Sequence, residues 1–381
     1  MKQGKELIFR NGPGDYMLNV AVITKNREFE GLRAEWDALL KNSSADNVFL
    51  TFDWMFTWWQ VFESKDKQLS IITARENEDL IAIAPLYIER KIFKTLKFMS
   101  AGDPLYPDYL NIIIKPGYEE EAVKLIFNKI AELNWDYINL TDIKNDSEIK
   151  ELLVKQVIPF AGSVCQRPAA ICHIINLPEL YCDYFSQRSR KQKLKINNSV
   201  NKLIRNSKKV QYHEYQTDEL ADAFNQLKEL HIKRWAAKGN SHVFKDDCYL
   251  SFHNRYINAA IKQSIPRIFS LTIDDKVVAI NYLYQYRQSL YYYQSGFDPD
   301  YALYRPGLLL LNNIIQQAIK ERLACFDFLQ GEHSYKEDWA NANNVTVSII
   351  WFKRSLKGQL AYTYSYIWPK LKINIKRIIG R

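Results

Sequence analysis

Long apolar runs are missing from this sequence. The longest apolar stretch, residues 80–88, contains Pro85 and is far shorter than the roughly 20 residues that a membrane-spanning helix needs. Residues 1–16 are polar and are interrupted by glycine and proline, so they lack the apolar core of a secretory signal. These absences predict a cytoplasmic protein.

Cysteine and histidine are also scarce. The five cysteines form no CxxC pair and leave an odd one over, and the six histidines show no ligand spacing. This pattern fits free thiols in a reducing compartment better than a disulfide framework. We therefore predict no bound metal.

Two stretches without acidic residues carry much of the positive charge. Nine Lys or Arg lie in residues 186–209 and eight in residues 339–381, and without them the remaining 35 bases are outnumbered by the 43 acids. Such local patches attract phosphate-rich or acidic partners. Each patch also fits a solvated helix face, which is the simpler interpretation.

Length and patterning predict two domains with one order of elements. A chain of 381 residues is too long for one ordinary core. In the first half, periodicity predicts strands at 19–24, 69–74, 80–89, 95–100, 109–114 and 137–140, and helices at 28–40, 51–62 and 119–133. In the second half it predicts helices at 188–206, 217–237, 249–262, 308–321 and 335–339, and strands at 209–215, 267–273, 276–286, 289–296, 325–329 and 346–352. Helices between antiparallel-looking strands indicate an α/β fold with mixed (α+β) sheets, and the shared order of elements in the two halves indicates a duplicated fold.

A turn into a helix carries the first candidate site. After the strand at 289–296, Arg305, Pro306 and Gly307 lead into an apolar helix that starts at Leu308. Backbone amides at a helix N-terminus bind phosphate, glycine allows close approach, and an arginine can fork onto a phosphate. The same residues also fit an ordinary strand-to-helix turn with proline in the first helical turn.

Ionisable residues follow the strand at 325–329. Glu332, His333, Tyr335 and Lys336 stand just beyond the strand end, where ligand clefts of α/β proteins lie. Glu332 or His333 can take a proton from an attacking amine or hydroxyl, and Lys336 can neutralise charge on an acyl oxygen. A polar surface loop is the alternative interpretation.

Together these motifs resemble the CelD/BcsL-like acyltransferases of the GNAT family. The likeness covers roughly the whole chain and is strongest over residues 180–340. It is carried by residues 327–329, 331–332, 335–336, Trp339, 305–307, 188–190, His231, 234–235, 238–239 and 297–298, and in the first half by Phe49, Trp54, 58–59 and 85–86.

The resemblance implies two tandem GNAT-like domains, as in the related Fem-type peptidoglycan bridge enzymes. It implies an N-terminal domain over residues 1–175, a catalytic domain over 176–353 and a basic amphipathic helix over 354–381. In Fem-type enzymes a lysine after an aromatic residue lies near the acyl group, and Lys336 matches that position. The implied site residues are Glu332, His333, Tyr335 and Lys336 for catalysis, Arg305, Gly307 and Leu308 for donor binding, and Arg188, Arg190, His231 and Trp339 for substrate binding.

The implied activity is that of a GNAT-type N- or O-acyltransferase. Its donor would be a thioester, acyl-CoA or an acyl carrier protein, and its acceptor an amine or hydroxyl of an envelope polysaccharide or lipid precursor. Only residues 305–307 match the usual GNAT phosphate loop, which leaves room for a carrier protein or an aminoacyl-tRNA as donor. Two alternatives stay open: a Fem-type transferase that uses aminoacyl-tRNA, the one nucleic acid we consider, and a non-catalytic assembly factor with the GNAT fold.

The C-terminal tail has the pattern of a basic amphipathic helix. Apolar residues recur at helical spacing among Lys and Arg: Leu356, Leu360, Tyr364, Ile367, Leu371, Ile375 and Ile378. Pro369 is expected to kink or divide this helix. Such a helix gains free energy in a lipid interface from apolar burial and from anionic headgroups, which favours peripheral contact with the inner membrane surface. Packing against the protein itself is the alternative.

We predict that the intact protein pellets with anionic vesicles in a liposome co-sedimentation assay. Binding is expected to fall as the salt concentration rises, because ions screen the attraction between the tail and the headgroups. Truncation after Trp368 is expected to abolish it. Equal pelleting of the truncated and intact proteins would show that the tail only packs.

Overall fold

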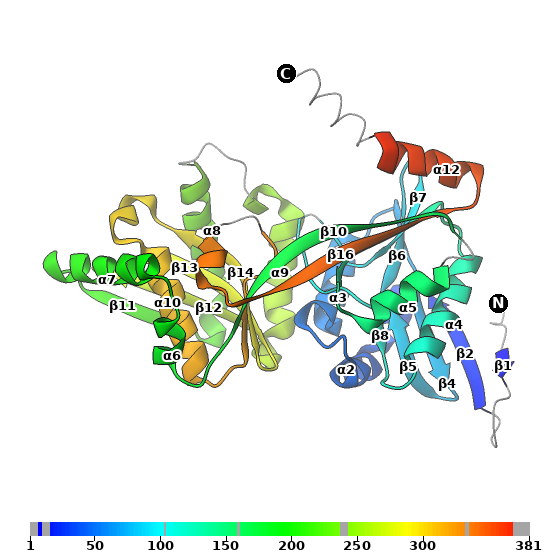
Figure 1. The fold of residues 1–381 in the computed structure, drawn as a ribbon, viewed down its shortest axis with the longest axis horizontal. Coiled ribbons are helices and arrows are strands. Elements are labelled where there is room, and N and C mark those ends of the chain that lie inside the picture. Colours follow the sequence, from blue (N-terminus) through cyan, green and yellow to red (C-terminus); the bar gives the residue numbers. More distant parts are fainter. Residues whose placement is uncertain are drawn as a thin grey trace. The chain divides into compact units, whose positions relative to one another are not determined.

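The computed structural model describes residues 7–9, 16–102, 104–157, 161–236, 243–331 and 335–368. The chain divides into two compact units: Met1–Ala170 together with Val345–Arg381 (unit 1), and Ile171–Asn344 (unit 2). The sequence of unit 2 therefore interrupts that of unit 1. Each unit combines strands and helices (Figure 1).

Unit 1 contains two groups of paired strands. The first has the order β1 (Leu7–Phe9), β2 (Tyr16–Ile23), β4 (Ile71–Glu76), β5 (Asp79–Ala84) and β8 (Ile113–Ile114). The second has the order β16 (Ala342–Lys353), β9 (Tyr137–Lys144), β7 (Lys94–Phe98), β6 (Leu86–Arg90) and β3 (Lys67–Leu69). The chain passes from the first group to the second at Pro85, which has no amide hydrogen to continue a ladder. Strands β7 and β9 are parallel, whereas the other described pairs of unit 1 are antiparallel.

Helices of unit 1 lie before and after these strands in the sequence. They are α1 (Asn26–Gly31), α2 (Arg33–Asn42), α3 (Phe52–Phe62), α4 (Glu119–Glu132) and α5 (Glu148–Val157). The Thr51 hydroxyl accepts a hydrogen bond from the Trp54 amide, so Thr51 caps α3. Trp54 and Trp59 are buried, and the aromatic residues of this helix therefore serve the core.

The sheet of unit 2 has one parallel pair among antiparallel strands. Its order is β11 (Val210–Glu214), β12 (Pro266–Ile273), β13 (Lys276–Tyr286), β14 (Ser289–Phe297), β15 (Cys325–Asp327) and the end of β10 (Ala161–Asn176). Strands β14 and β15 are parallel and pair only through Ser289–Tyr291 of β14. Beyond Tyr291, β14 continues for six residues to Phe297, whereas β15 ends at Asp327. The two strands thus pair at one end alone.

Helices cover both faces of this sheet (Figure 1). They are α6 (Tyr181–Ser186), α7 (Arg190–Arg205), α8 (Leu220–Ala236), α9 (Asp247–Ala260), α10 (Pro306–Lys320) and α11 (Tyr335–Trp339). Because side chains alternate along a strand, Ala279 and Leu283 lie on one face of β13. Both belong to the hydrophobic core that also contains Ile314 of α10. On the opposite face the ring of Tyr282 contacts Phe224 of α8.

The expected fold class is confirmed: both units are mixed α/β structures with a mixed arrangement of strands. The duplicated order is also visible. In each unit a helix, α4 or α10, leads into the second strand of a parallel pair, β7 with β9 and β14 with β15.

The C-terminal end differs from the expected division into residues 176–353 and 354–381. Strand β16 joins unit 1 from Val345 onward, because its residues 349–352 pair with residues 137–140 of β9. The helix that follows runs as α12 (Leu356–Tyr362) and continues as a π-helical turn (Thr363–Ile367). Pro369, Leu371, Ile375 and Ile378 lie outside the described residues. Within the described ranges, every helix is too short or too polar to span a bilayer.

We expect Gly296→Ala to destabilise the protein. A Cβ on Gly296 would lie 2.8 Å from the backbone nitrogen of His231, so β14 or α8 would have to shift. Overpacking of this kind costs about 1–3 kcal/mol, which is a fall of several degrees in melting temperature. Gly307→Ala is the matched control: its Cβ would meet only a Phe297 ring carbon at 3.9 Å, and its melting temperature should not fall. Equal melting temperatures for wild type and Gly296→Ala would contradict the close packing of α8 on β14.

Candidate functional site

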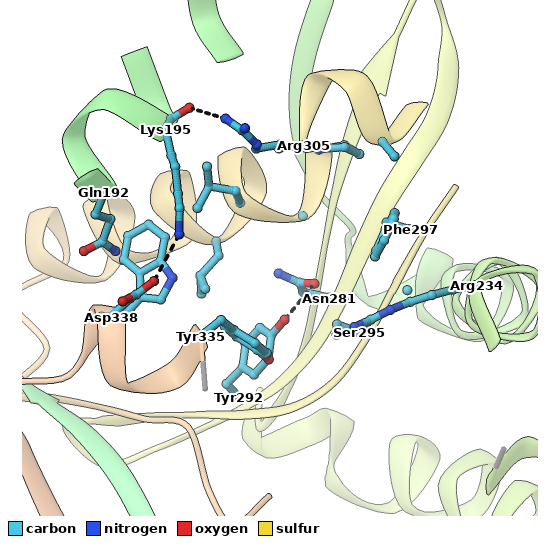
Figure 2. A pocket seen from close by; sticks show the side chains of 17 residues that line it. Gln192, Lys195, Arg234, Asn281, Tyr292, Ser295, Phe297, Arg305, Tyr335 and Asp338 are labelled. Atoms are coloured by element: carbon cyan, nitrogen blue, oxygen red, sulfur yellow. Dashed lines mark hydrogen bonds and ion pairs between the residues drawn. The ribbon is translucent and has the colours of Figure 1, made fainter. Parts of the chain in front are cut away.

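A pocket of about 290 Å³ opens in unit 2 beside the part of β14 that extends beyond its pairing with β15 (Figure 2). One wall is the end of β14, and a second is the start of α10. Residues of α11 and α7 complete it, together with Asn281 of β13 and Arg234 of α8. Apolar surface with a few polar groups is typical of small-molecule sites.

The first turn of α10 presents backbone to the pocket. Arg305 is the N-cap, with a left-handed φ of 51°, and its side chain does not cap the helix. Pro306, Gly307 and Leu308 follow in the pocket wall. Because an added Cβ on Gly307 would meet only Phe297, the space beside this glycine is open. The structure therefore places an N-terminal helix dipole against a cavity, which favours an anionic group there.

The loop between β14 and α10 is held by Asp298. This carboxylate is 1% exposed and forms ion pairs with Lys233 at 2.6 Å and Lys276 at 3.0 Å. Burial acts to raise the pKa of Asp298, but hydrogen bonds from the two lysines hold it below its usual value. Asp298 also accepts a hydrogen bond from the Asp300 amide at the start of the turn Pro299–Tyr304, which leads to Arg305.

A chain of hydroxyl groups lies at one side of the pocket. Tyr335 hydrogen-bonds to Tyr292, and the Tyr292 hydroxyl donates to Asn281 Oδ1 at 3.4 Å. Burial raises the pKa of both tyrosines, so both hydroxyls are protonated near neutral pH. Figure 2 shows the Asn281 amide nitrogen turned toward the middle of the pocket.

Three polar side chains of the pocket have buried atoms without a hydrogen-bond partner among the described residues. They are both amide atoms of Gln192, the Nδ2 atom of Asn281 and the Nε atom of Arg234. Gln192 and Asn281 are each 1% exposed. Buried polar groups are nearly always satisfied, so these atoms indicate where a polar ligand or ordered water binds.

Basic residues of α7 lie next to the pocket. A shallow groove is lined by Arg190, Lys191, Lys195 and Arg305, and the last two also line the pocket. The Lys195 ammonium forms an ion pair with Asp338 at 3.3 Å. The groove adjoins the pocket, and its positive charge suits a phosphate-bearing ligand.

Lys336 lies behind the pocket wall rather than in it. It is 4% exposed, and its ammonium donates to the carbonyl oxygens of Phe328 at 2.8 Å, Leu329 at 3.0 Å and Gln330 at 2.6 Å. These carbonyls converge because Leu329 has a left-handed φ of 56°. The three ammonium hydrogens are thus directed at backbone, which differs from the expected orientation into the cleft.

Two residues that were predicted to bind substrate, Arg188 and His231, also contact backbone. Arg188 Nη1 donates to the Trp339 carbonyl at 2.5 Å and lies 4.4 Å from the Tyr184 ring centroid. His231 Nδ1 lies 3.0 Å from the Ser295 carbonyl oxygen, and its ring packs on Phe244.

The structure thus brings some predicted site residues together and separates others. Arg305, Gly307, Leu308, Tyr335 and Trp339 line the pocket, and Arg190 lines the adjoining groove. Arg188, His231 and Lys336 are buried outside the pocket wall. Glu332 and His333 lie outside the described residues. The chemical roles of all these residues stay predictions.

Sequence reasoning missed Asn281, Tyr292 and Gln192. Asn281 was detectable, because it is the single amide within the otherwise apolar and aromatic run of residues 277–284. Gln192 was not detectable, because a polar residue in a basic, polar helix is ordinary and indicates no site. Among the described residues, no group of three His, Cys, Asp or Glu side chains could hold a metal ion.

Comparisons with known proteins agree with this geometry. The family model of the acetyltransferase (GNAT) domain matches residues 190–337. No curated protein sequence matches the chain significantly. Residues 190–337 are therefore similar to a GNAT acetyltransferase domain.

Solved structures similar to this chain share its fold. FemX has a TM-score of 0.61 at 10% identity, over 91% of this chain and 99% of FemX. A conserved protein of unknown function from Bacteroides thetaiotaomicron has a TM-score of 0.54 at 12% identity, over 87% of this chain and 100% of its own. The C-terminal domain of a proposed lysylphosphatidylglycerol synthetase from Agrobacterium fabrum has a TM-score of 0.51 at 10% identity, over 89% of this chain and 96% of its own. At such identities the likeness shows the fold alone, and the expected tandem GNAT-like arrangement is confirmed.

We predict that Lys336→Met lowers the free energy of unfolding by about 2–4 kcal/mol, because three buried carbonyls lose a charged donor. Lys195→Met is the comparison, since it removes a half-exposed ion pair worth less than about 1 kcal/mol. Urea unfolding of the two variants measures the difference. If Lys336→Met is as stable as wild type, the ammonium does not hold the loop.

Proposed function

We propose that unit 2 is an acyltransferase that moves an acyl group from a thioester donor to an amine or hydroxyl. The observation that supports this most directly is the pocket between the first turn of α10 and the end of β14 that extends beyond its pairing with β15. It lies within the residues that match the acetyltransferase domain. A helix N-terminus and a largely apolar cavity suit the phosphate and the arm of one donor molecule.

The donor is proposed to bind with its phosphates at Gly307 and Leu308. Arg305, whose Nη1 donates to the Lys195 carbonyl at 3.4 Å, stands beside these amides. The thioester would then extend along β14 toward Tyr335. Acyl-CoA and an acyl carrier protein both carry this phosphate and arm, so both fit the same pocket.

The proposed reaction is direct attack of the acceptor on the thioester carbonyl. The acceptor nitrogen or oxygen bonds to the carbonyl carbon, the carbon–sulfur bond breaks, and the acceptor's proton is balanced by one that reaches the sulfur. Tyr335 is the proposed proton donor to sulfur, because it lines the pocket beside the proposed path of the thioester. Glu332 or His333 is the proposed base. Lys336 is proposed to support the reaction by holding the loop that carries them.

The acceptor is proposed to be an envelope polysaccharide or lipid precursor at the inner membrane surface. The basic groove of α7 suits the phosphates of a nucleotide-linked or lipid-linked acceptor, and the basic tail suits the membrane. Membership of the CelD/BcsL type is part of the same proposal.

Aminoacyl transfer is the second candidate. It is favoured by the fold shared with FemX and with the domain of the proposed lysylphosphatidylglycerol synthetase. The groove lined by Arg190, Lys191 and Arg305 would then hold phosphates of an aminoacyl-tRNA.

We expect Gly307→Val to weaken donor binding by about tenfold or more, because its side chain enters the open space beside the helix. Calorimetry with acyl-CoA, acyl carrier protein and aminoacyl-tRNA identifies the donor of the wild type and measures the loss. Gly307→Ala adds one methyl group and should bind with an intermediate constant. Normal binding by Gly307→Val would contradict the phosphate site, and binding of aminoacyl-tRNA alone would favour the second candidate.

A further inference from the structure

We propose that Asn281 and Arg234 form the site that receives the carbonyl oxygen of the transferred acyl group. This inference rests on the proposed acyl transfer and adds two residues that contact the reacting atoms. Neither residue belongs to the first turn of α10, and neither lies on α11. They come from β13 and α8, yet both line the same pocket.

Asn281 has the position of a core residue and the chemistry of a binding residue. It is 1% exposed and lies on the face of β13 that sends Ala279 and Leu283 into the core beneath α10. An apolar residue would fill that position without leaving a polar atom unsatisfied. The unpartnered Nδ2 atom therefore costs stability unless something in the pocket accepts its hydrogens.

The orientation of this amide is set by Tyr292. The Tyr292 hydroxyl donates to Asn281 Oδ1, so the oxygen side of the amide is occupied and the nitrogen side faces the pocket (Figure 2). Tyr292 itself accepts hydrogen bonds from Tyr335 and Ser295. Tyr292 is thus a positioning residue: it prepares the Asn281 donor before any ligand arrives.

Arg234 provides a second donor with positive charge. Its Nε atom is buried without a hydrogen-bond partner among the described residues. Its guanidinium lies 4.9 Å from the centroid of the Phe297 ring, which fixes the side chain at the end of β14. Its charge also acts on the hydroxyls of Tyr292 and Tyr335, so it lies close to the same group of side chains.

An amide donor beside a cation suits an oxygen that gains negative charge during the reaction. When the acceptor bonds to the carbonyl carbon, the π electrons of C=O move to the oxygen. Asn281 Nδ2 and Arg234 Nε then stabilise this oxyanion. When C=O forms again, the carbon–sulfur bond breaks, its electron pair goes to sulfur, and the sulfur takes the proton that the acceptor loses. Donors placed in advance stabilise such a charge because they need no reorganisation.

The test uses the full-length protein and acetyl and dodecanoyl thioesters of CoA and of a bacterial acyl carrier protein, with the carbonyl carbon labelled with ¹³C. Infrared difference spectra of the bound thioester report hydrogen bonds to its oxygen. Wild type is expected to shift the C=O stretch to lower wavenumber. Asn281→Leu should lose most of that shift, and Tyr292→Phe should lose part of it.

Turnover gives the second readout, with hydroxylamine as acceptor. Asn281→Leu is expected to lower kcat by about 100-fold, as loss of one oxyanion donor does elsewhere, while the donor dissociation constant changes little. Tyr292→Phe should lower kcat by a smaller factor. Tyr181→Phe is the matched control: it also removes a tyrosine hydroxyl bonded to an asparagine, Asn312, at 2.6 Å, but lies outside the pocket lining. It should leave both readouts unchanged.

The outcomes separate this inference from the proposed function. If no thioester binds the wild type, the thioester-transfer function fails and the inference fails with it. If thioesters bind and turn over but Asn281→Leu and Tyr292→Phe keep the wild-type C=O stretch and kcat, the oxyanion site is wrong and acyl transfer stands. Melting temperatures show that the variants are folded. Should Asn281→Leu not fold, Tyr292→Phe alone decides through the same two readouts.

Discussion

The short parallel pairing of β14 with β15 is the constraint on which the site depends. Three residues of β14 pair, and six more continue without β15. A fully paired β14 would use its backbone groups within the sheet, and the space beside Tyr292 and Ser295 would be filled by a neighbouring strand. Because β15 ends at Asp327, the chain can instead turn back through α11, and Tyr335 reaches the pocket from there. The cavity is thus a consequence of topology, and the side chains decide what it binds.

Buried charged groups hold the walls of this cavity. Lys336 gathers three carbonyls of the loop after β15, and Arg188 binds the carbonyl at the end of α11. Asp298, paired with Lys233 and Lys276, fixes the opposite loop before α10. A charged group is costly to bury unless its hydrogen bonds are complete. Several charged residues that resemble catalytic ones in the sequence therefore position backbone. The hydrogen-bond donors that line the pocket include neutral groups, side-chain amides and tyrosine hydroxyls, which are harder to recognise in the sequence than charged residues.

Local patterns predicted most elements but not their partners. Strands β12 to β14 were predicted within a residue or so, because each alternates clearly and ends at a turn. Strand β10 was missed over its whole length, since Gly162, Pro168 and exposed polar residues hide its long-range pairing. The start of α10 was predicted as a pocket wall from Pro306 and Gly307, whose chemistry is local. The direction of Lys336 was not predictable, because it follows from carbonyls that converge only after Leu329 adopts its left-handed conformation. Asn281 can be identified as a binding residue only when the cavity beside it is known.

The interruption of unit 1 by unit 2 has a consequence for the order of folding. During synthesis the residues of unit 2, Ile171–Asn344, are complete before β16 has emerged. Unit 2 can therefore bury its core while β9 still lacks its antiparallel neighbour on one side, the strand at residues 345–353. If unit 2 were unfolded, pairing residues 345–353 with β9 would close a long flexible loop, which costs conformational entropy. A folded unit 2 has already fixed the distance between its two ends, so adding the last strand then costs less entropy. Unit 2 would thus be the scaffold on which unit 1 finishes folding.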